Sequence, residues 1–149
     1  MSKFELTLNY KKGRAGEINV VAELTTRGYS IKDYTGDYDT HRNKQVKGYD
    51  IEFFNTLTQE WDRADIKTNV KNGWTYLEIE KYPSGAPGWF YTSAADSIIT
   101  YDIENHKCYI YSLKEMRNYV QGKEFKRVGR NKDLISFPVE NSKLIKLMF

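Results

Sequence analysis

The chain has 149 residues, 40% of them hydrophobic, and a formal net charge of +3. This length suits one domain with one core, and no apolar run approaches the ~20 residues that span a bilayer. The single cysteine, Cys108, excludes an internal disulfide and a thiolate metal cluster; with no signal-peptide pattern at the start, we expect a cytoplasmic protein.

The first 28 residues predict a basic segment followed by a helix. Residues 1–14 are polar and basic. Between 17 and 26, four apolar residues fall near helical spacing: Ile18, Val21, Ala22 and Leu24. Gly28 follows them as a C-terminal cap.

The middle of the chain predicts a series of short strands. Each has alternating or continuous apolar residues between turn residues: 28–35, 49–55, 60–67, 74–82, 93–102 and 107–112. Polar or glycine-rich loops separate some of them, at 36–48 and 83–88.

A second helix is predicted over 112–121. Ser112 and Glu115 match a capping box, and Leu113, Met116 and Val120 form its apolar stripe. We therefore expect one mixed α/β or α+β domain over 1–149, with a basic N-terminal segment (1–14) and a basic C-terminal tail (123–149).

The strands 49–55 and 60–67 predict a hairpin with an unusual pair of acids. If Asn55 faces Glu60 across the turn at 56–59, Asp50 lies opposite Asp65. Two carboxylates that close either share a proton or share a cation. A hard divalent cation such as Mg²⁺ fits, because it takes one or two carboxylates plus water and phosphate oxygens.

Two further groups belong to this strand face. Lys67 lies on the same face as Asp65, where it can offset negative charge, orient a water or contact a phosphate. The carbonyl of Ile66 between them can supply another oxygen ligand. The hairpin pattern by itself also fits a merely solvated strand face, and a one-residue slip of register would reverse the faces.

In order and spacing, these residues resemble the PD-(D/E)XK nuclease superfamily. Asp50 matches its first acid, and Asp65-Ile66-Lys67 matches its D-X-K motif. The resemblance implies a restriction-endonuclease-like core, a central mixed β-sheet flanked by helices. It also implies that Glu17 on the first helix and Glu80 on the following strand join the site, in the first or second coordination shell.

Parts of the chain resemble particular members of this superfamily. The stretch around Glu17 is similar to archaeal-type Holliday junction resolvases, and residues 84–102 to phage and mobile-element nucleases. Tyr49, not proline, precedes Asp50. An alternative core would take Asp65 as the first acid and 78–80 as an E-X-E variant; Asp65-Ile66-Lys67 is preferred because it includes the lysine.

The resemblance implies a divalent-metal-dependent DNA endonuclease, with Mg²⁺ as cofactor and Mn²⁺ able to replace it. Asp50, Asp65, the Ile66 carbonyl and Glu80 would hold the metal, and Lys67 would position the nucleophile. We expect a homodimer that acts on duplex or branched DNA and selects DNA by structure, as a junction resolvase does. The resemblance implies an origin in a phage or a mobile element, with a bacterial host cell in the case of a phage.

The DNA itself would meet basic and aromatic side chains near the site. The basic residues flank the proposed centre: Lys11, Lys12, Arg14, Arg42, Lys44 and Lys47. The aromatic residues are Tyr34, Tyr38, Trp74 and Trp89. Three other readings stay open: a restriction-type enzyme, a non-catalytic nucleic-acid-binding protein with the nuclease fold, and a structural or inhibitory protein.

Overall fold

The computed structural model describes residues 3–35, 48–68, 70–71, 74–81, 84–124, 126–128, 134–140 and 145–149. Its helices are α1 (Lys3–Thr26), α3 (Trp89–Thr92) and α4 (Leu113–Val120). Its strands are β1 (Ile31–Asp33), β2 (Ile51–Asn55), β3 (Glu60–Lys67), β4 (Val70–Lys71), β5 (Trp74–Lys81), β6 (Ser97–Asp102), β7 (Lys107–Ser112), β8 (Lys126–Val128), β9 (Leu134–Glu140) and β10 (Lys146–Leu147). No helix in these ranges is long and apolar enough to cross a membrane.

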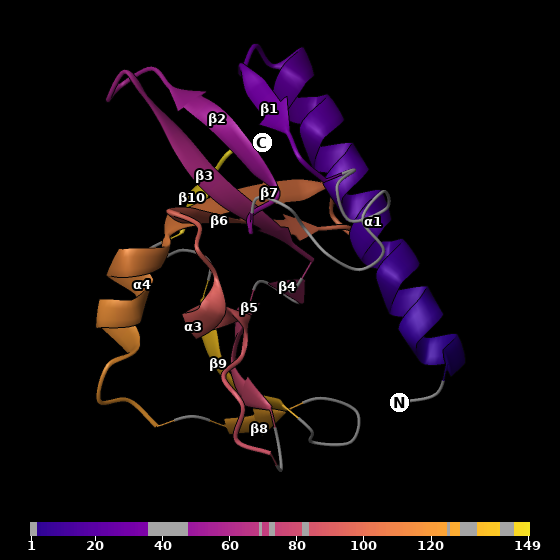
Figure 1. Cartoon of the computed structure of the whole chain (residues 1–149), viewed down its shortest axis with the longest axis vertical. Helices are drawn as coiled ribbons and strands as arrows, with labels where there is room; N and C mark the ends of the chain where they lie inside the picture. The colour runs from indigo at the N-terminus through magenta and orange to yellow at the C-terminus, as the bar shows by residue number, and fades with distance from the viewer. Residues whose placement is uncertain are drawn as a thin grey trace.

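A six-stranded sheet, in the order β1-β2-β3-β6-β7-β10, forms the main layer (Figure 1). Its β3 and β6 pair in parallel, and its other neighbours pair antiparallel. The parallel pair needs a long crossover, and residues 68–96 supply it through β4, β5 and α3. This confirms the predicted mixed α+β fold with a central mixed sheet.

A second sheet has four strands in the order β4-β5-β9-β8 (Figure 1). Two of its strands, β8 and β9, come from the tail, and β10 pairs with β7 in the main sheet. The C-terminal tail is therefore built into both sheets, where the sequence suggested only a basic extension. Since strand pairing needs a distant partner, the tail's own pattern did not reveal it.

The first helix is longer than the sequence predicted, because α1 begins at Lys3 and includes most of the expected basic segment. Its buried residues are Val20 and Leu24, while Ile18 is 52% exposed. Of the predicted stripe, Leu24 is buried and Val21 is partly buried, whereas Ile18 and Ala22 are exposed. Val20, which was not predicted, is buried beside Leu24. The helix ends as expected: Gly28 has φ +92°, and the Tyr29 N–H donates to the Leu24 carbonyl.

Two apolar cores lie on opposite faces of the main sheet. On one face α1 packs through Val20 and Leu24 onto side chains of the sheet: Ile51, Phe53, Ala64, Ile66, Ile99, Tyr101 and Cys108. On the other face α3, α4 and β5 pack onto Ile98 and Tyr111. Because strand side chains alternate, the odd-numbered residues of β3 near its end point toward the α3 side.

The second predicted helix, α4, is confirmed. Ser112 caps it by accepting from the Glu115 N–H at 3.2 Å, and Leu113, Met116 and Val120 are buried. The short helix α3 was not predicted from the sequence, which assigned no element to residues 89–92. It buries Phe90 between α4 and β5.

Candidate metal and nucleic-acid site

The β2–β3 hairpin has the predicted register. Asn55 pairs with Glu60 and Ile51 with Ala64, so Asp50 comes next to Asp65 at the end of the ladder. Ile51, Ala64 and Ile66 are buried under α1. The burial of these apolar residues fixes the register, since a one-residue slip would turn them to the other face.

Each of the two aspartate carboxylates accepts a hydrogen bond from a backbone N–H group of the neighbouring segment. The Asp50 N–H donates to Asp65 Oδ1 at 3.1 Å, and the Ile66 N–H donates to Asp50 Oδ2 at 2.6 Å. Their side chains are nearly covered, with 8% and 7% of Asp50 and Asp65 exposed. Each of the two buried carboxylates is therefore held by a hydrogen bond to the backbone of the strand segment that carries the other.

Ser93 also holds Asp65, and the sequence did not single it out. Its Oγ donates to Asp65 Oδ2. Ser93 follows α3, which the sequence did not predict, and it lies 28 positions from Asp65 along the chain. Of the described lysines and arginines, none forms a salt bridge with Asp65.

Lys67 lies on the same face as Asp65, as predicted. Its Nζ is 5.2 Å from the centre of the Trp89 ring, within cation–π range. Trp89, a candidate for stacking on DNA bases, is half-buried at the start of α3 and packs against the core on that face of the main sheet. The tryptophan therefore steadies the lysine at the end of β3.

Glu17 reaches the same end of β3 from α1. Its neighbour Gly16 lets the helix approach closely, because a Cβ there would lie 2.5 Å from Thr68 Cγ2. Arg14, one turn earlier, pairs with Glu17 at 3.3 Å. The structure thus brings Glu17 toward the Asp50 and Lys67 charges, as the sequence pattern predicted.

The electrostatics of Glu17 reflect this position. Burial, followed by the negative charge of Asp50, raises the pKa of Glu17 to about 7. The positive charges of Arg14 and Lys67 act in the opposite direction but do not cancel the shift. Glu17 is therefore a carboxyl that can gain or release a proton near neutral pH.

Glu80 is placed elsewhere. It lies on β5 in the four-stranded sheet, opposite Ile135 of β9, and it bridges to Pro87. No contact that the structure describes joins it to Asp50 or Asp65. The chain leaves the main sheet after β3, and both β4 and β5 belong to the second sheet, so β5 does not lie beside the D-X-K motif. The alternative E-X-E core, which needs Glu78 and Glu80, is in that same second sheet.

The donor set fits a hard divalent cation bound by two carboxylates. No group of three or more His, Cys, Asp or Glu side chains suited to a metal is present among the described residues. The expected set with Glu80 is therefore not assembled. Asp50, Asp65 and the Ile66 carbonyl offer oxygen donors only, and Mg²⁺ commonly completes such a set with water and substrate phosphate.

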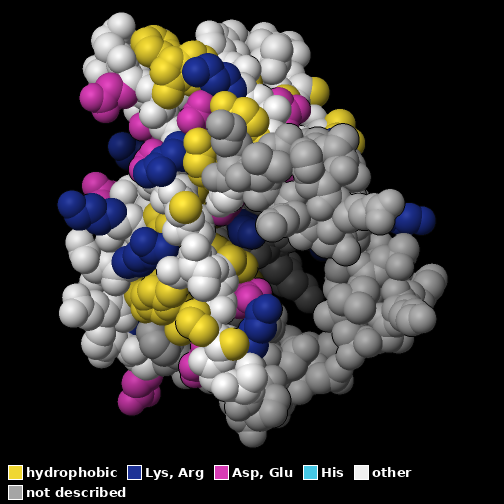
Figure 2. Space-filling view, in the orientation of Figure 1, with side chains coloured by type: hydrophobic (Ala, Val, Ile, Leu, Met, Phe, Trp, Pro, Cys, Tyr) yellow, Lys and Arg dark blue, Asp and Glu magenta, His cyan; other side chains and the backbone are white. Residues whose placement is uncertain are grey.

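The predicted DNA-binding cations are only partly described. Lys11 and Lys12 on α1 are exposed, and Arg14 is engaged with Glu17. Arg42, Lys44, Lys47 and Tyr38 lie outside the described residues. On the face shown in Figure 2, the described lysines and arginines are interspersed with aspartates and glutamates instead of forming one basic patch.

Of the remaining predicted aromatic contacts, one is free to meet a base. Trp74 is 43% exposed at the start of β5. Tyr34 is half-buried, and its hydroxyl donates to Glu52 at 3.0 Å. Tyr34 therefore belongs to the packing of the β1–β2 region.

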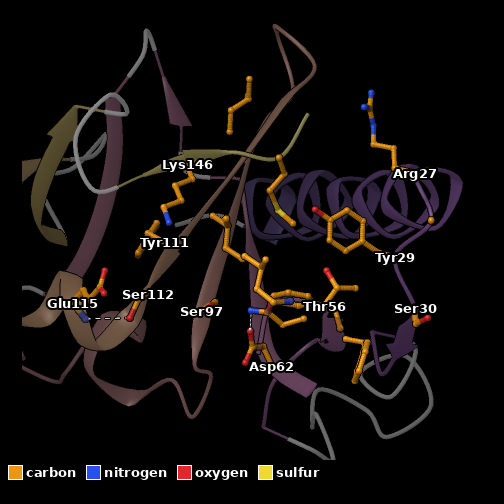
Figure 3. Close-up of a pocket in the computed structure, with 18 residues that line it drawn as sticks. Arg27, Tyr29, Ser30, Thr56, Asp62, Ser97, Tyr111, Ser112, Glu115 and Lys146 are labelled. Atoms are coloured by element: carbon orange, nitrogen blue, oxygen red, sulfur yellow. Dashed lines mark hydrogen bonds between the residues drawn. The ribbon is translucent and has the colours of Figure 1, made fainter. Parts of the chain in front are cut away.

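A separate cavity of about 700 Å³ lies at the other end of the hairpin (Figure 3). Residues from several elements line it, among them Tyr29, Thr56, Asp62, Ser97, Glu115 and Lys146. Glu17, Asp50, Asp65 and Lys67 do not line it. The cavity and the carboxylate pair are therefore distinct features of the same sheet.

Comparison with known proteins gives one similar fold to report. No protein-family model and no curated protein matches the chain. Among solved structures, the chain is similar to a bacterial homing endonuclease, I-Ssp6803I, at 13% sequence identity and a TM-score of 0.47. The match covers 84% of this chain and 87% of that one. A likeness of this degree carries no conclusion about activity, which has to come from the geometry of the site.

Proposed function

We propose that the chain is a divalent-metal-dependent endonuclease that hydrolyses DNA phosphodiesters. One observation carries this proposal: Asp50 and Asp65 are buried side by side on adjacent strands, with Lys67 on the same face. Burying like charges together is unfavourable unless a proton or a cation joins them. The resemblance of the Asp50 and Asp65-Ile66-Lys67 pattern to PD-(D/E)XK nucleases favours a catalytic cation.

Each residue of the site has a role in this reaction. Asp50, Asp65 and the Ile66 carbonyl would hold Mg²⁺ or Mn²⁺. The bound ion would polarise the phosphate and lower the pKa of a water. Lys67 would place its ammonium against the developing negative charge and orient the attacking water. Glu17, with its raised pKa, would exchange a proton at the same end of β3.

The finer features of the function are also proposals. We infer a structure-selective enzyme, similar in this respect to Holliday junction resolvases, that acts as a homodimer and comes from a phage or a mobile element. The stretch around Glu17 and residues 84–102 support this through their resemblance to such enzymes. A restriction-type enzyme is the alternative, with the 33–48 loop as its base-reading element.

A cleavage assay tests the proposal directly. Labelled duplex, single-stranded, flap and four-way-junction DNA are incubated with the protein in Mg²⁺, Mn²⁺ or EDTA. We expect the wild-type protein to cleave DNA only when a metal ion is present. The cleavage rate should fall by at least about 1000-fold in Asp65→Asn, since the variant loses a metal ligand. Asp62→Asn is the matched control on the same strand, because Asp62 bonds to Asn55 and not to the site.

The other functional classes give different results in this assay. A non-catalytic DNA-binding protein would bind in a salt-sensitive manner but leave every substrate uncut in both metals. A structural or inhibitory protein would show no salt-sensitive binding. Cleavage by Asp65→Asn at the wild-type rate would refute the proposed site.

A further inference from the structure

The hydroxyl of Ser93 has one specific acceptor. Ser93 Oγ donates to Asp65 Oδ2 and accepts from the Ala95 N–H at 3.2 Å. A serine hydroxyl has a single proton, and the Ala95 contact uses a lone pair. The proton of Ser93 is therefore committed to Asp65.

The backbone of Ser93 is itself held at both ends. Its N–H donates to the Trp89 carbonyl at 2.9 Å. Its carbonyl accepts from Arg117 Nη2 at 3.2 Å, and Arg117 Nε donates to the Phe90 carbonyl at 2.9 Å. Arg117 thus joins α4 to both ends of the α3 turn, which lies beside α4 in Figure 1.

The result is a chain of contacts from the second helix layer to the carboxylate pair. Asp65 Oδ1 accepts from the Asp50 N–H, and Asp65 Oδ2 accepts from Ser93. Donors on both oxygens fix the plane of the carboxylate. Each oxygen keeps a second lone pair for a ligand, so the hydrogen bonds orient the group without blocking it.

We propose that Ser93 is a positioning residue for Asp65, and that Arg117 holds Ser93 in place for this task. The inference rests on the proposed function, since it assigns Asp65 as a metal ligand. Side chains that orient a ligand through a hydrogen bond change metal affinity by roughly 10- to 100-fold when they are removed. Ser93 and Arg117 contact Asp65 and its loop, not the substrate.

The test measures Mn²⁺ binding to the full chain by calorimetry, without DNA. Ser93→Thr and Ser93→Val have the same shape, but only threonine keeps the hydroxyl. We expect threonine to bind Mn²⁺ within about 3-fold of wild type, and valine to bind about 10-fold more weakly. Arg117→Met should also weaken Mn²⁺ binding, but by a smaller factor than Ser93→Val does. Ser84→Ala, in the exposed loop before α3, is the control and should leave affinity unchanged.

The outcomes separate this inference from the proposed function. Equal affinity in the threonine and valine variants, with Asp65→Asn unable to bind, would overturn the role of Ser93 alone. Wild-type protein that binds no Mn²⁺, or binds it equally well as Asp65→Asn, would overturn both. Circular dichroism and a thermal melt establish that each variant is folded; Ser93→Ala replaces the valine variant if valine prevents folding.

Discussion

Asp65 lies on β3, and Asp96 lies directly before the neighbouring strand β6, but the two carboxylates have opposite kinds of hydrogen-bond donor. Asp96 is half-exposed and pairs with the Arg63 guanidinium at 3.0 and 3.2 Å. Asp65 is buried, and its donors are the Asp50 N–H and the Ser93 hydroxyl, which carry no net charge. The arginine lowers the pKa of Asp96, because it favours the charged carboxylate.

The difference separates a structural carboxylate from one that is available for chemistry. The charge of Asp96 is already balanced by Arg63, so Asp96 does not require a further cation. Asp65 has a second carboxylate beside it, and its hydrogen-bond donors among the described residues are neutral, which favours binding of an external cation. The two residues are of the same type and lie close together in the main sheet, so what distinguishes them is the charge of their hydrogen-bond donors.

Lys67→Met should give the largest effect among the variants that leave both aspartates intact. We expect cleavage to fall by roughly 100-fold or more, because the ammonium would no longer stabilise negative charge in the transition state. Mn²⁺ affinity should change little, since Lys67 is not a ligand. Single-turnover cleavage and calorimetry measure the two quantities.

Lys32→Met is the matched control for that variant. Lys32 also lies over a tryptophan, with its Nζ 4.2 Å from the centre of the Trp61 ring, but it lies on β1 and pairs with Glu52. Its loss should leave cleavage close to wild type. Equal losses in the two variants would mean that Lys67 acts only through packing on its aromatic ring.

Glu17→Gln should stabilise the metal-free protein at alkaline pH. The pKa of Glu17 is raised from 4.5 to about 7 in the folded protein, so the folded state binds the proton more tightly than the unfolded state. Stability from this group is therefore present at low pH and is lost as pH rises from about 4.5 to 7. We expect a gain of about 1–2 kcal/mol at pH 8 and little change at pH 4, measured by urea unfolding.

Glu23→Gln serves as the control on the same helix. Glu23 pairs with Arg27 at 2.9 Å and lies away from Asp50. Its replacement should not stabilise the protein at pH 8. A similar gain from both variants would trace the effect to the general charge of α1 and not to the site.

Asp96→Asn should have the smallest effect and should act on stability alone. The Arg63–Asp96 pair has 45% and 44% of its side chains exposed, so its loss should cost only about 0.5 kcal/mol at pH 7. Because the pKa of Asp96 is lowered, this contribution is lost as pH falls below the ordinary value of 3.8. Cleavage should stay at the wild-type rate; a large loss of activity would remove the distinction between Asp96 and Asp65.

Local patterns predicted the elements whose signal lies within a few residues. The hairpin of β2 and β3 follows from alternation and its turn, and α4 follows from its cap and apolar stripe. The start of α1 and the three strands of the tail were missed. Strand pairing of the tail depends on β5 and β7, which lie far away in sequence, so no local pattern encodes it.

The candidate site divides in the same way. Register alone predicted that Asp50 and Asp65 meet, and the family resemblance implied that Glu17 on the first helix lies near them. Ser93 was missed because a serine after a four-residue helix has no recognisable pattern. Glu80 was expected at the site because β5 follows β3 in sequence, but the chain leaves the main sheet between them.

The sequence by itself determined a mixed α+β chain, a hairpin with two opposed aspartates, and a lysine on their face. These are properties of alternation and register, which a short segment carries in its own residues. Only the tertiary structure decided which carboxylates are buried, which donors hold them and which acids stand apart. Those outcomes depend on how α1, α3 and the second sheet pack around β3. Such packing depends on residues far apart in the chain, so the sequence of no single segment predicts it.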